Sequence, residues 1–404
     1  MFKEINTCPI SNSKDYVTYL DLGLMPLVNN LNNTKEESLN CTKVPLKVNF
    51  YPSSGLSMLS HIVDPNVLFS HYVYKSGTSQ PYIDHCKEMF YHIDDLTHFF
   101  RTGIPLVVDI GGNDGSLLNT FKSLQSNIDV LNVDPSDVTE ISISKGIPTH
   151  RGMWNSDFAK TLENKCSVIT STNVFQHLED IDDFVKGISI ALKENGIWCL
   201  EFPYWKENLE TYQYDQIYHE HIYYYLVTPL IKLFYKHGLR IKDYRKLLIH
   251  GGSMRILIEK SKQPSLLDYP FVIEEKKLNA DYHIKWGQHI KSNIIGDKQF
   301  IYYLKHQGYK VVGFGAAAKG CIFLNTCEID SNFMSYVVDD TDSKQGKFIP
   351  GTGIPIVSRE KLIQDPPDYI VILAHNFAKY ITESLRPIFK GKFITMFPEI
   401  KIYE

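Results

Sequence analysis

The stretch VVDIGGNDGSLL, residues 107–118, decides the fold of this chain. A short apolar run closed by an acidic residue predicts a buried parallel strand. Gly111, Gly112 and Gly115 then let the backbone turn tightly against a bound cofactor before a helix begins. The next predicted strand ends in Asp134, about 20 residues further on, where a carboxylate can hold two ribose hydroxyls. We therefore expect a cofactor at this turn, the alternative being a glycine turn that serves packing only.

The spacing of the glycines bears on the kind of cofactor. The dinucleotide fingerprint G-x-G-x-x-G is not met, because Asn113 and Ser116 stand at two of its glycine positions. The acidic form D-x-G-x-x-x-G fits S-adenosylmethionine better. Asp109 and Asp114 would repel a pyrophosphate but tolerate a cationic sulfonium with its ammonium group.

Outward from this turn, predicted strands and helices alternate, which indicates a doubly wound parallel sheet in an α/β protein. An antiparallel hairpin is expected at 239–260, at the edge of that sheet. The expected parallel strands span 129–134, 166–175 and 196–203, and the expected helices lie at 116–125, after Pro135, at 180–193 and at 230–238.

A second glycine turn, VVGFGAAAKG at 311–320, opens another alternating pattern. It satisfies G-x-G-x-x-A, with Asp339 and Asp340 closing the next strand, and read alone it proposes a dinucleotide site. A degenerate α/β domain that has lost its cofactor is an equal alternative. Lys319, just inside the following helix, would favour a phosphate in either case.

These patterns divide the 404 residues into three parts. Residues 1–62 form a small N-terminal module of short β-type runs, and residues 63–262 hold the first α/β domain. Residues 263–404 contain a charged helical connector and a C-terminal Rossmann-like domain.

Composition excludes several classes of protein. A net charge of −4 and a pI of about 6.4 favour neither nucleic acid nor an anionic membrane. The seven cysteines contain no CxxC pair, so a reduced, cytoplasmic setting is expected. No apolar run approaches 18 residues, so neither a signal peptide nor a membrane span is expected.

Several segments, in this order, carry a family resemblance: DIGGNDGSLL, STNVFQHLEDIDDFVKGI, GIWCLEFPY, YHEHIYYY, IHGGSMR, GFGAAAKG and KFIPGTGIPI. Together they resemble the sugar C-methyltransferases, which methylate nucleotide-linked 4-keto-deoxysugars with S-adenosylmethionine. The resemblance covers nearly the whole chain. It implies a Rossmann-like class I methyltransferase domain between an N-terminal zinc module and a C-terminal Rossmann-like domain that helps hold the sugar nucleotide.

The chain departs from the family at the zinc site. The family's two CxxC pairs align with Cys8-Pro9-Ile10-Ser11 and with Tyr51-Pro52-Ser53-Ser54, so three of four thiolates are missing. Serine and tyrosine are poor zinc ligands. We expect the module to fold without zinc, with Tyr51 as a packing substitute.

The resemblance also assigns the methyl donor site. Asn173 and Val174, near the end of the expected strand at 166–175, are expected to line it. The full set of expected donor-binding residues is Asp109, Gly111, Asn113, Asp114, Gly115, Asp134, Asn173 and Val174.

The stretch Tyr218-His219-Glu220-His221 matches the family's Tyr-x-Glu-His motif. By this resemblance His221 is the base, Glu220 orients it or binds the sugar, and Tyr218 places a hydroxyl near the keto-sugar. Tyr72 and His177 match further active-site residues, although a lone histidine such as His177 is as often structural.

The same stretch does not predict a metal site. The H-E-x-x-H metal helix needs two imidazoles at i and i+4, and adjacent residues cannot present them that way. His219 is therefore interpreted as structural or solvent-facing. Tyr223, Tyr224 and Tyr225 are interpreted as packing residues.

Substrate contacts are expected from three segments. In IHGGSMR, paired glycines allow close backbone approach, and Ser253 and Arg255, joined by His250, could grip a phosphate or sugar. The alternative there is a hairpin turn with an exposed arginine. The other expected substrate-binding residues are Tyr74, Ser76 and Ser79, beside Tyr72, and Lys319.

The resulting hypothesis is methylation at C3 of a nucleotide-diphosphate 4-keto-6-deoxysugar, with a histidine generating an enolate. An O-methyltransferase acting on a sugar hydroxyl and a non-catalytic nucleotide-sugar binding protein remain as alternatives, and an NAD-dependent oxidoreductase ranks last. The expected partner is the sugar nucleotide, bound by a monomer or small homo-oligomer.

Overall fold

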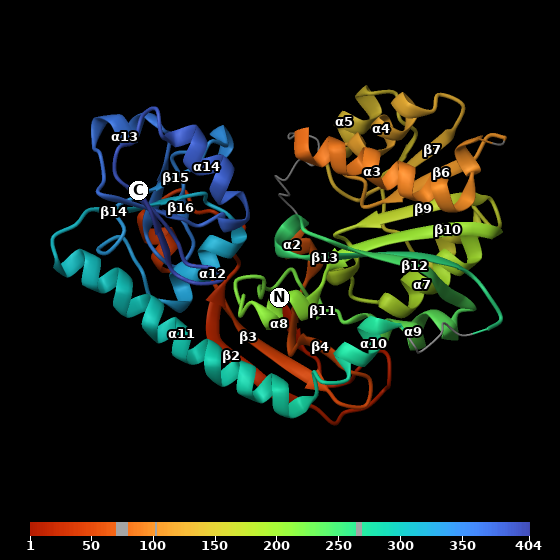
Figure 1. Ribbon diagram of the computed structural model, residues 1–404, viewed down its shortest axis with the longest axis horizontal. Helices are drawn as coiled ribbons and strands as arrows, with labels where there is room; N and C mark the ends of the chain where they lie inside the picture. Colours follow the sequence, from red (N-terminus) through yellow and green to blue (C-terminus); the bar gives the residue numbers. More distant parts are fainter. Residues whose placement is uncertain (70–79, 102, 264–268) are drawn as a thin grey trace.

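The computed structural model describes residues 1–69, 80–101, 103–263 and 269–404 (Figure 1). Within these ranges, no helix combines the length and the apolar character needed to cross a membrane.

The predicted doubly wound sheet is present, with seven strands in the order β12-β13-β10-β9-β6-β7-β8. Its five strands from β10 to β8 are parallel, and β13 runs antiparallel to both β10 and β12. The predicted hairpin is therefore confirmed at one edge. The strands are β6 (Leu106–Ile110), β7 (Asp129–Val133), β8 (Thr149–His150), β9 (Cys166–Thr172), β10 (Leu192–Pro203), β12 (Leu239–Leu247) and β13 (Ser253–Lys260).

Helices cover both faces of this central sheet because its strands are apolar on both sides. α3 (Gln80–Thr97) and α4 (Ser116–Leu124) pack on one face, and α7 (Ile181–Ala191) and α9 (Val227–Lys236) pack on the other. Shorter helices are α5 (Thr139–Ser144), α6 (Ser156–Lys160), α8 (Trp205–Glu210) and α10 (Pro270–Glu275).

The N-terminal module is built around a four-stranded sheet in the order β11-β4-β3-β2. Its outer strand β11 (Tyr223–Tyr224) comes from the central domain, with Tyr223 opposite Met58. The other elements are β1 (Phe2–Glu4), β2 (Val17–Pro26), α1 (Lys35–Leu39), β3 (Lys43–Tyr51), β4 (Leu56–Leu59), β5 (His61–Val63) and α2 (Pro65–Phe69).

The C-terminal domain is the second predicted α/β unit, with strand order β16-β17-β15-β14-β18-β19-β20. Its outermost strands β16 and β20 are antiparallel to their neighbours, and the five between them are parallel. Its elements are β14 (Val311–Phe314), α12 (Ala318–Thr326), β15 (Val337–Val338), β16 (Phe348–Ile349), β17 (Ile354–Val357), α13 (Glu360–Gln364), β18 (Tyr369–Ile372), α14 (Ala378–Leu385), β19 (Lys392–Thr395) and β20 (Lys401–Tyr403).

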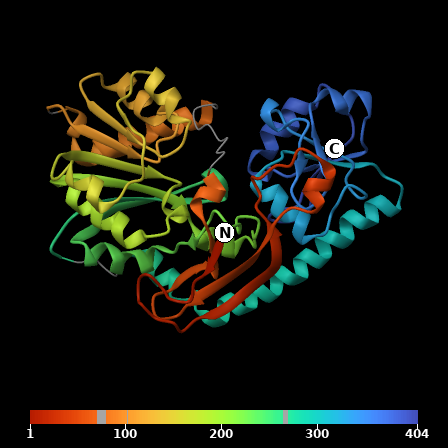
Figure 2. The same cartoon turned by 180° about the vertical axis from the view of Figure 1, so that it is seen from behind.

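One long helix joins the parts. α11 (Ala280–His306) contacts β2 and β3 of the N-terminal module and β14 of the C-terminal domain. Seen from behind, the N-terminal strands lie on this helix at the base of the molecule, between the two α/β domains (Figure 2). Gly287 makes the approach possible, because a Cβ there would lie 1.8 Å from the backbone oxygen of Tyr19.

Replacing Gly287 with alanine should therefore force α11 away from β2. We expect Gly287→Ala to lower the free energy of unfolding by about 1–3 kcal/mol, the usual cost of overpacking, or more because the clash is with backbone. Gly296→Ala is the matched control, since its Cβ would meet nothing within 4 Å on the same helix; it should stabilise by about 0.5–1 kcal/mol. Urea-unfolding midpoints of the two variants check this, and equal midpoints would contradict it.

Candidate active site

The turn after β6 depends on glycine at two positions, one for a close contact and one for a left-handed backbone conformation. A Cβ at Gly111 would lie 2.2 Å from Cγ2 of Val174, and Gly115, at φ +74°, is the N-cap of α4. At the end of β7, Asp134 Oδ2 accepts a hydrogen bond of 2.9 Å from the backbone N–H of Asn113. The structure thus brings the turn, the acid on the next strand and Val174 together at the carboxyl edge of the central sheet.

This edge is acidic. Burial raises the pKa of Asp109 to about 7; the carboxylates of Asp134 and Asp114 add to the rise, and a hydrogen bond from Thr170 Oγ1 (2.7 Å) opposes it. A cation bound here would relieve that repulsion. The residues therefore fit the sulfonium and ammonium groups of S-adenosylmethionine. Asn173 follows β9 at the same edge, in a left-handed conformation, with its N–H donated to Glu201 O (2.9 Å).

Tyr218 and His221 form a hydrogen-bonded pair. His221 Nδ1 lies 2.9 Å from the backbone oxygen of Gln216, and since a carbonyl only accepts, Nδ1 carries a proton. When the ring is neutral, Nε2 is then the acceptor for the Tyr218 hydroxyl, 2.7 Å away. His221 is buried and Tyr218 half-buried. The arrangement places a basic nitrogen behind a phenol, a pair that can accept a proton.

His177 lies beside this pair, with its ring centroid 5.0 Å from that of His221. Its Nδ1 donates to the backbone oxygen of Glu220 (2.6 Å). Burial lowers the pKa of His177 to about 4, so the ring is neutral near pH 7. The sequence resemblance predicted Tyr218, Glu220, His221 and His177 for one site. The structure brings these four residues together.

Glu220 has a partner that the sequence did not suggest. Nδ2 of Asn29, in the N-terminal module, lies 2.8 Å and 2.7 Å from the two carboxylate oxygens of Glu220. Burial raises the pKa of Glu220 to about 7, and the bond from Asn29 opposes this rise. Asn29 lies 191 positions away in an asparagine-rich loop that matched no catalytic pattern.

His219 of the motif and the three tyrosines that follow it serve packing. His219 is buried, and its Nε2 lies 3.2 Å from the backbone oxygen of Val44, so its structural interpretation is confirmed. The packing interpretation of Tyr223, Tyr224 and Tyr225 is also confirmed, since all three are buried.

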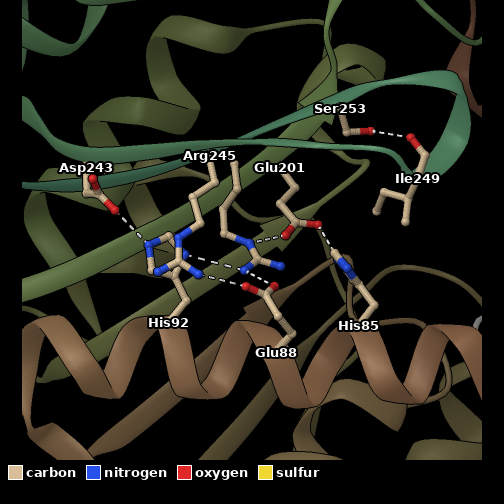
Figure 3. Close-up of polar contacts among 9 residues, drawn as sticks. His85, Glu88, His92, Glu201, Asp243, Arg245, Ile249 and Ser253 are labelled. Atoms are coloured by element: carbon tan, nitrogen blue, oxygen red, sulfur yellow. Dashed lines mark hydrogen bonds and ion pairs between the residues drawn. The ribbon is translucent and has the colours of Figure 1, made fainter.

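Arg255 of β13 forms ion pairs with Glu201 of β10 and Glu88 of α3. Figure 3 labels these two acids and shows that they lie between the strands and the helix. Arg255 is 0% exposed, and its guanidinium donates to Glu201 and Glu88. Burial opposes ionisation of Glu201, but Arg255 and His85 together hold the pKa of Glu201 below its usual range. The alternative interpretation of Arg255 as an exposed arginine in a hairpin turn is therefore wrong. A substrate phosphate would have to displace one of these acids to reach the guanidinium.

This ion-pair network includes a further residue that sequence reasoning missed. His85 Nε2 lies 2.7 Å from Glu201 Oε2, on the side of α3 that faces the carboxyl end of β10 (Figure 3). A histidine in the first turns of a helix gives no pattern that distinguishes it from a surface residue.

The remaining residues predicted to bind substrate lie in different parts of the structure. Ser253 is buried and its hydroxyl donates to Ile249 O (3.2 Å), so it closes the turn before β13. Lys319 lies near Asp215, just before the Tyr-x-Glu-His segment: burial lowers the pKa of Lys319 and the Asp215 carboxylate opposes this. Asp215 also lies 3.2 Å from His375 Nδ1. Predictions outside the described residues or side chains are Tyr72, Tyr74, Ser76, Ser79 and the side chain of His250.

The residues aligned with the zinc ligands do converge, but they do not fit the metal. Cys8 Sγ lies 3.2 Å from Ser54 Oγ, and Tyr51 is fully buried beside them. One thiol among hydroxyls is a poor zinc donor set. In the part of the chain that the structure describes, no group of three or more histidine, cysteine or acidic side chains could hold a metal ion.

Three protein-family profiles match consecutive parts of the chain. A zinc binding domain matches residues 8–69, a methyltransferase domain matches 85–243, and a C-methyltransferase C-terminal domain matches 248–398. Their order is that of the three structural parts.

The chain is also similar to individual proteins. C-methyltransferase NovU of Streptomyces niveus is 27% identical over 420 residues, which cover 99% of this chain and 97% of NovU. Among solved structures, magnesium protoporphyrin IX methyltransferase of Synechocystis PCC 6803, with bound SAH, is 13% identical (TM-score 0.35; 44% of this chain, 83% of that chain). The CurJ carbon methyltransferase is 11% identical (TM-score 0.36; 50% of this chain, 62% of that chain).

Removing metal should leave the N-terminal module intact, because hydrogen bonds rather than thiolates join its two turns. We expect the purified chain to contain well under one zinc per molecule by elemental mass spectrometry. Dialysis against a chelator should leave its melting temperature unchanged. One tightly held zinc per chain would contradict this.

Replacing Arg255 should cost stability, because buried Glu201 would lose its guanidinium partner and keep His85 alone of the two. We expect Arg255→Met to lower the free energy of unfolding by about 3–5 kcal/mol. Arg245, which is 45% exposed and binds the same Glu88, is the matched control, and Arg245→Met should cost about 1 kcal/mol or less. Chemical denaturation measures both; an unchanged Arg255→Met stability with a raised KM would instead indicate a substrate ligand.

Proposed function

We propose that the substrate of this chain is a nucleotide-diphosphate 4-keto-6-deoxysugar, which is methylated at C3. The chain is an S-adenosylmethionine-dependent methyltransferase of the C-methyltransferase family. The observation that carries the proposal is the Tyr218–His221 pair, a proton acceptor that lies next to Glu220 and His177.

Carbon methylation sets a chemical requirement that the pair meets. A carbon atom is a poor nucleophile unless a neighbouring carbonyl acidifies its C–H bond. A 4-keto group does this at C3, so a positioned base can form an enolate there. A hydroxyl acceptor would need no ketone, and the C-methyltransferase relatives therefore favour a keto-sugar over an unoxidised sugar.

The donor supplies an electrophilic methyl group, so the protein's work is to hold it and to move one proton. Asp109, Asp114 and Asp134 would hold the cationic end of the donor and its ribose at the turn after β6. The missing side chain at Gly111 lets Val174 pack directly against this turn.

The proton leaves C3 for the Tyr218–His221 pair. The phenol oxygen takes it as the phenol's own proton passes to Nε2 of His221, whose Nδ1 stays bonded to Gln216 O. The electrons of the C3–H bond enter the enolate, with the charge on O4. As C3 bonds to the methyl group, the C–S electron pair stays on sulfur, and the proton on His221 passes to solvent.

Glu220 is suited to stabilise the enolate oxygen. With a pKa of about 7 it is partly protonated near neutral pH, so its carboxyl can donate to a developing negative charge. Lys319 and the residues beside Tyr72 are proposed to hold the diphosphate and the sugar.

The activity test presents thymidine-, uridine-, guanosine- and cytidine-diphosphate keto-sugars with the methyl donor. We expect a mass gain of about 14 daltons on one keto-sugar, with the methyl located on C3 by NMR, since only an acidified C–H can react. Methylation of the unoxidised sugar on oxygen would contradict the proposal, and donor binding without turnover would indicate a binding protein.

Tyr218→Phe and Tyr223→Phe form a matched pair within the same test. Each removes one hydroxyl, but the Tyr223 hydroxyl donates to the Glu179 backbone oxygen (3.3 Å) rather than to a titratable side chain. We expect kcat to fall about 10²–10⁴-fold in Tyr218→Phe and His221→Gln, and to stay near wild type in Tyr223→Phe. Exchange of the C3 proton in heavy water, with S-adenosylhomocysteine bound, should fall in parallel.

A further inference from the structure

Among the residues that the structure describes, the side chain that counters the burial of Glu220 comes from the N-terminal module. Asn29 donates from Nδ2 to both carboxylate oxygens, at 2.8 Å and 2.7 Å. Glu220 is 6% exposed, whereas Asn29 is exposed at the surface. A donor at this position favours the ionised carboxylate, because the bond is strongest to the charged form.

The loop that presents Asn29 is held firmly. Its preceding residues Leu27 and Val28 are buried, and Asn30 N–H donates to Leu27 O (3.1 Å) across the turn. Two positions later, Asn32 pairs with Phe348 of β16 through two backbone hydrogen bonds, of 2.8 Å and 3.1 Å. The loop therefore leaves the N-terminal sheet and is fastened to the C-terminal domain.

α1 fastens the loop a second time. Ser38, fully buried, donates its hydroxyl to Ile349 O (2.6 Å) and accepts from the N–H of Gly353 (3.0 Å). Its backbone oxygen accepts from Gly351 N–H (2.9 Å). The turn between β16 and β17 thus closes around α1, and the C-terminal domain fixes where Asn29 can reach.

The other titratable groups around Glu220 do not replace this control. His177 donates to the Glu220 backbone and is neutral, because burial lowers its pKa to about 4. Cys321 of α12 also lies close enough to interact with Glu220, and burial, with the Cys41 thiol, raises its pKa far above neutrality, so it stays uncharged. Tyr218 and His221 lie on the same segment and bond to each other.

We propose that Asn29 is a positioning residue that sets the proton affinity and orientation of Glu220. Through its loop, the C-terminal domain fixes the position of the active-site carboxyl. The N-terminal module, which lacks the ligands of a zinc site, thereby contributes to catalysis by carrying Asn29. The catalytic part of this inference rests on the proposed function; the coupling between the two side chains does not.

The coupling can be measured without substrate, from stability against pH. A carboxyl whose folded pKa is raised makes the folded state less stable as pH rises from its unfolded pKa, about 4.3, to the folded value of about 7. Above that pH its effect is constant. Glu220→Gln removes this titration, so the difference in melting temperature between wild type and Glu220→Gln isolates it.

Asn29→Ala should extend the decline to higher pH, by on the order of one unit, because the ionised form loses its donor. Asn29→Asp, which is isosteric but places a second carboxylate there, should extend it further. Both effects should vanish in the Glu220→Gln background. Asn30→Ala, the adjacent exposed residue, is the control and should follow wild type. A pH shift that persists in Glu220→Gln, or none in either Asn29 variant, would overturn the proposal.

The catalytic consequence is read from the pH profile of kcat in the full chain. The limb that reports Glu220 should move upward in Asn29→Ala and further in Asn29→Asp, while donor binding by calorimetry stays unchanged. A uniform loss of kcat with no movement of either limb would show that Asn29 has only a structural role. If wild type does not methylate the keto-sugar, the proposed function fails while the stability experiment still decides the coupling.

Discussion

The backbone pairing of Tyr223–Tyr224 with β4 is the constraint on which the site depends. These two residues make the end of the Tyr-x-Glu-His segment a strand of the N-terminal sheet, opposite Met58 and Ser57. Just before them, Ile222 bonds through its oxygen to Leu59 N–H and through its N–H to Gln176 O, both at 2.8 Å. The segment is thus bonded both to the N-terminal sheet and to the short helical turn Phe175–His177 that follows β9. Proton transfer needs such fixed geometry, because a small displacement of a base costs much of its rate.

Burial sets the chemistry of this fixed segment. It raises the pKa of Glu220 to about 7 and lowers that of His177 to about 4, so near neutral pH Glu220 is partly protonated and His177 is uncharged. A few angstroms away, the tautomer of His221 follows from one backbone carbonyl rather than from a charge. At the donor edge of the central sheet several carboxylates lie close together, so this edge favours a bound cation. One fold therefore keeps a buried proton-handling cluster beside an acidic donor site.

The N-terminal module joins its two turns without the thiolates of a zinc site. The turns that would carry two CxxC pairs still meet, through Cys8 and Ser54, and the aromatic ring of Tyr51 is buried beside them. What the module still provides is an extra strand partner for β11 and a loop that reaches the C-terminal domain. Both depend on backbone hydrogen bonds, which tolerate changes of side chain that a metal site does not.

The sequence by itself determined the two alternating α/β patterns, the glycine turn with its acidic partner and the Tyr-x-Glu-His motif. These are local features, since periodicity and turn chemistry act over a few residues. Only the tertiary structure decided that Arg255 is enclosed by Glu201 and Glu88, and that Asn29 reaches Glu220 across 191 positions. Ion pairs and hydrogen bonds between distant segments depend on which surfaces become buried together. No local pattern records that, so an asparagine in a polar loop looked ordinary until the chain was folded.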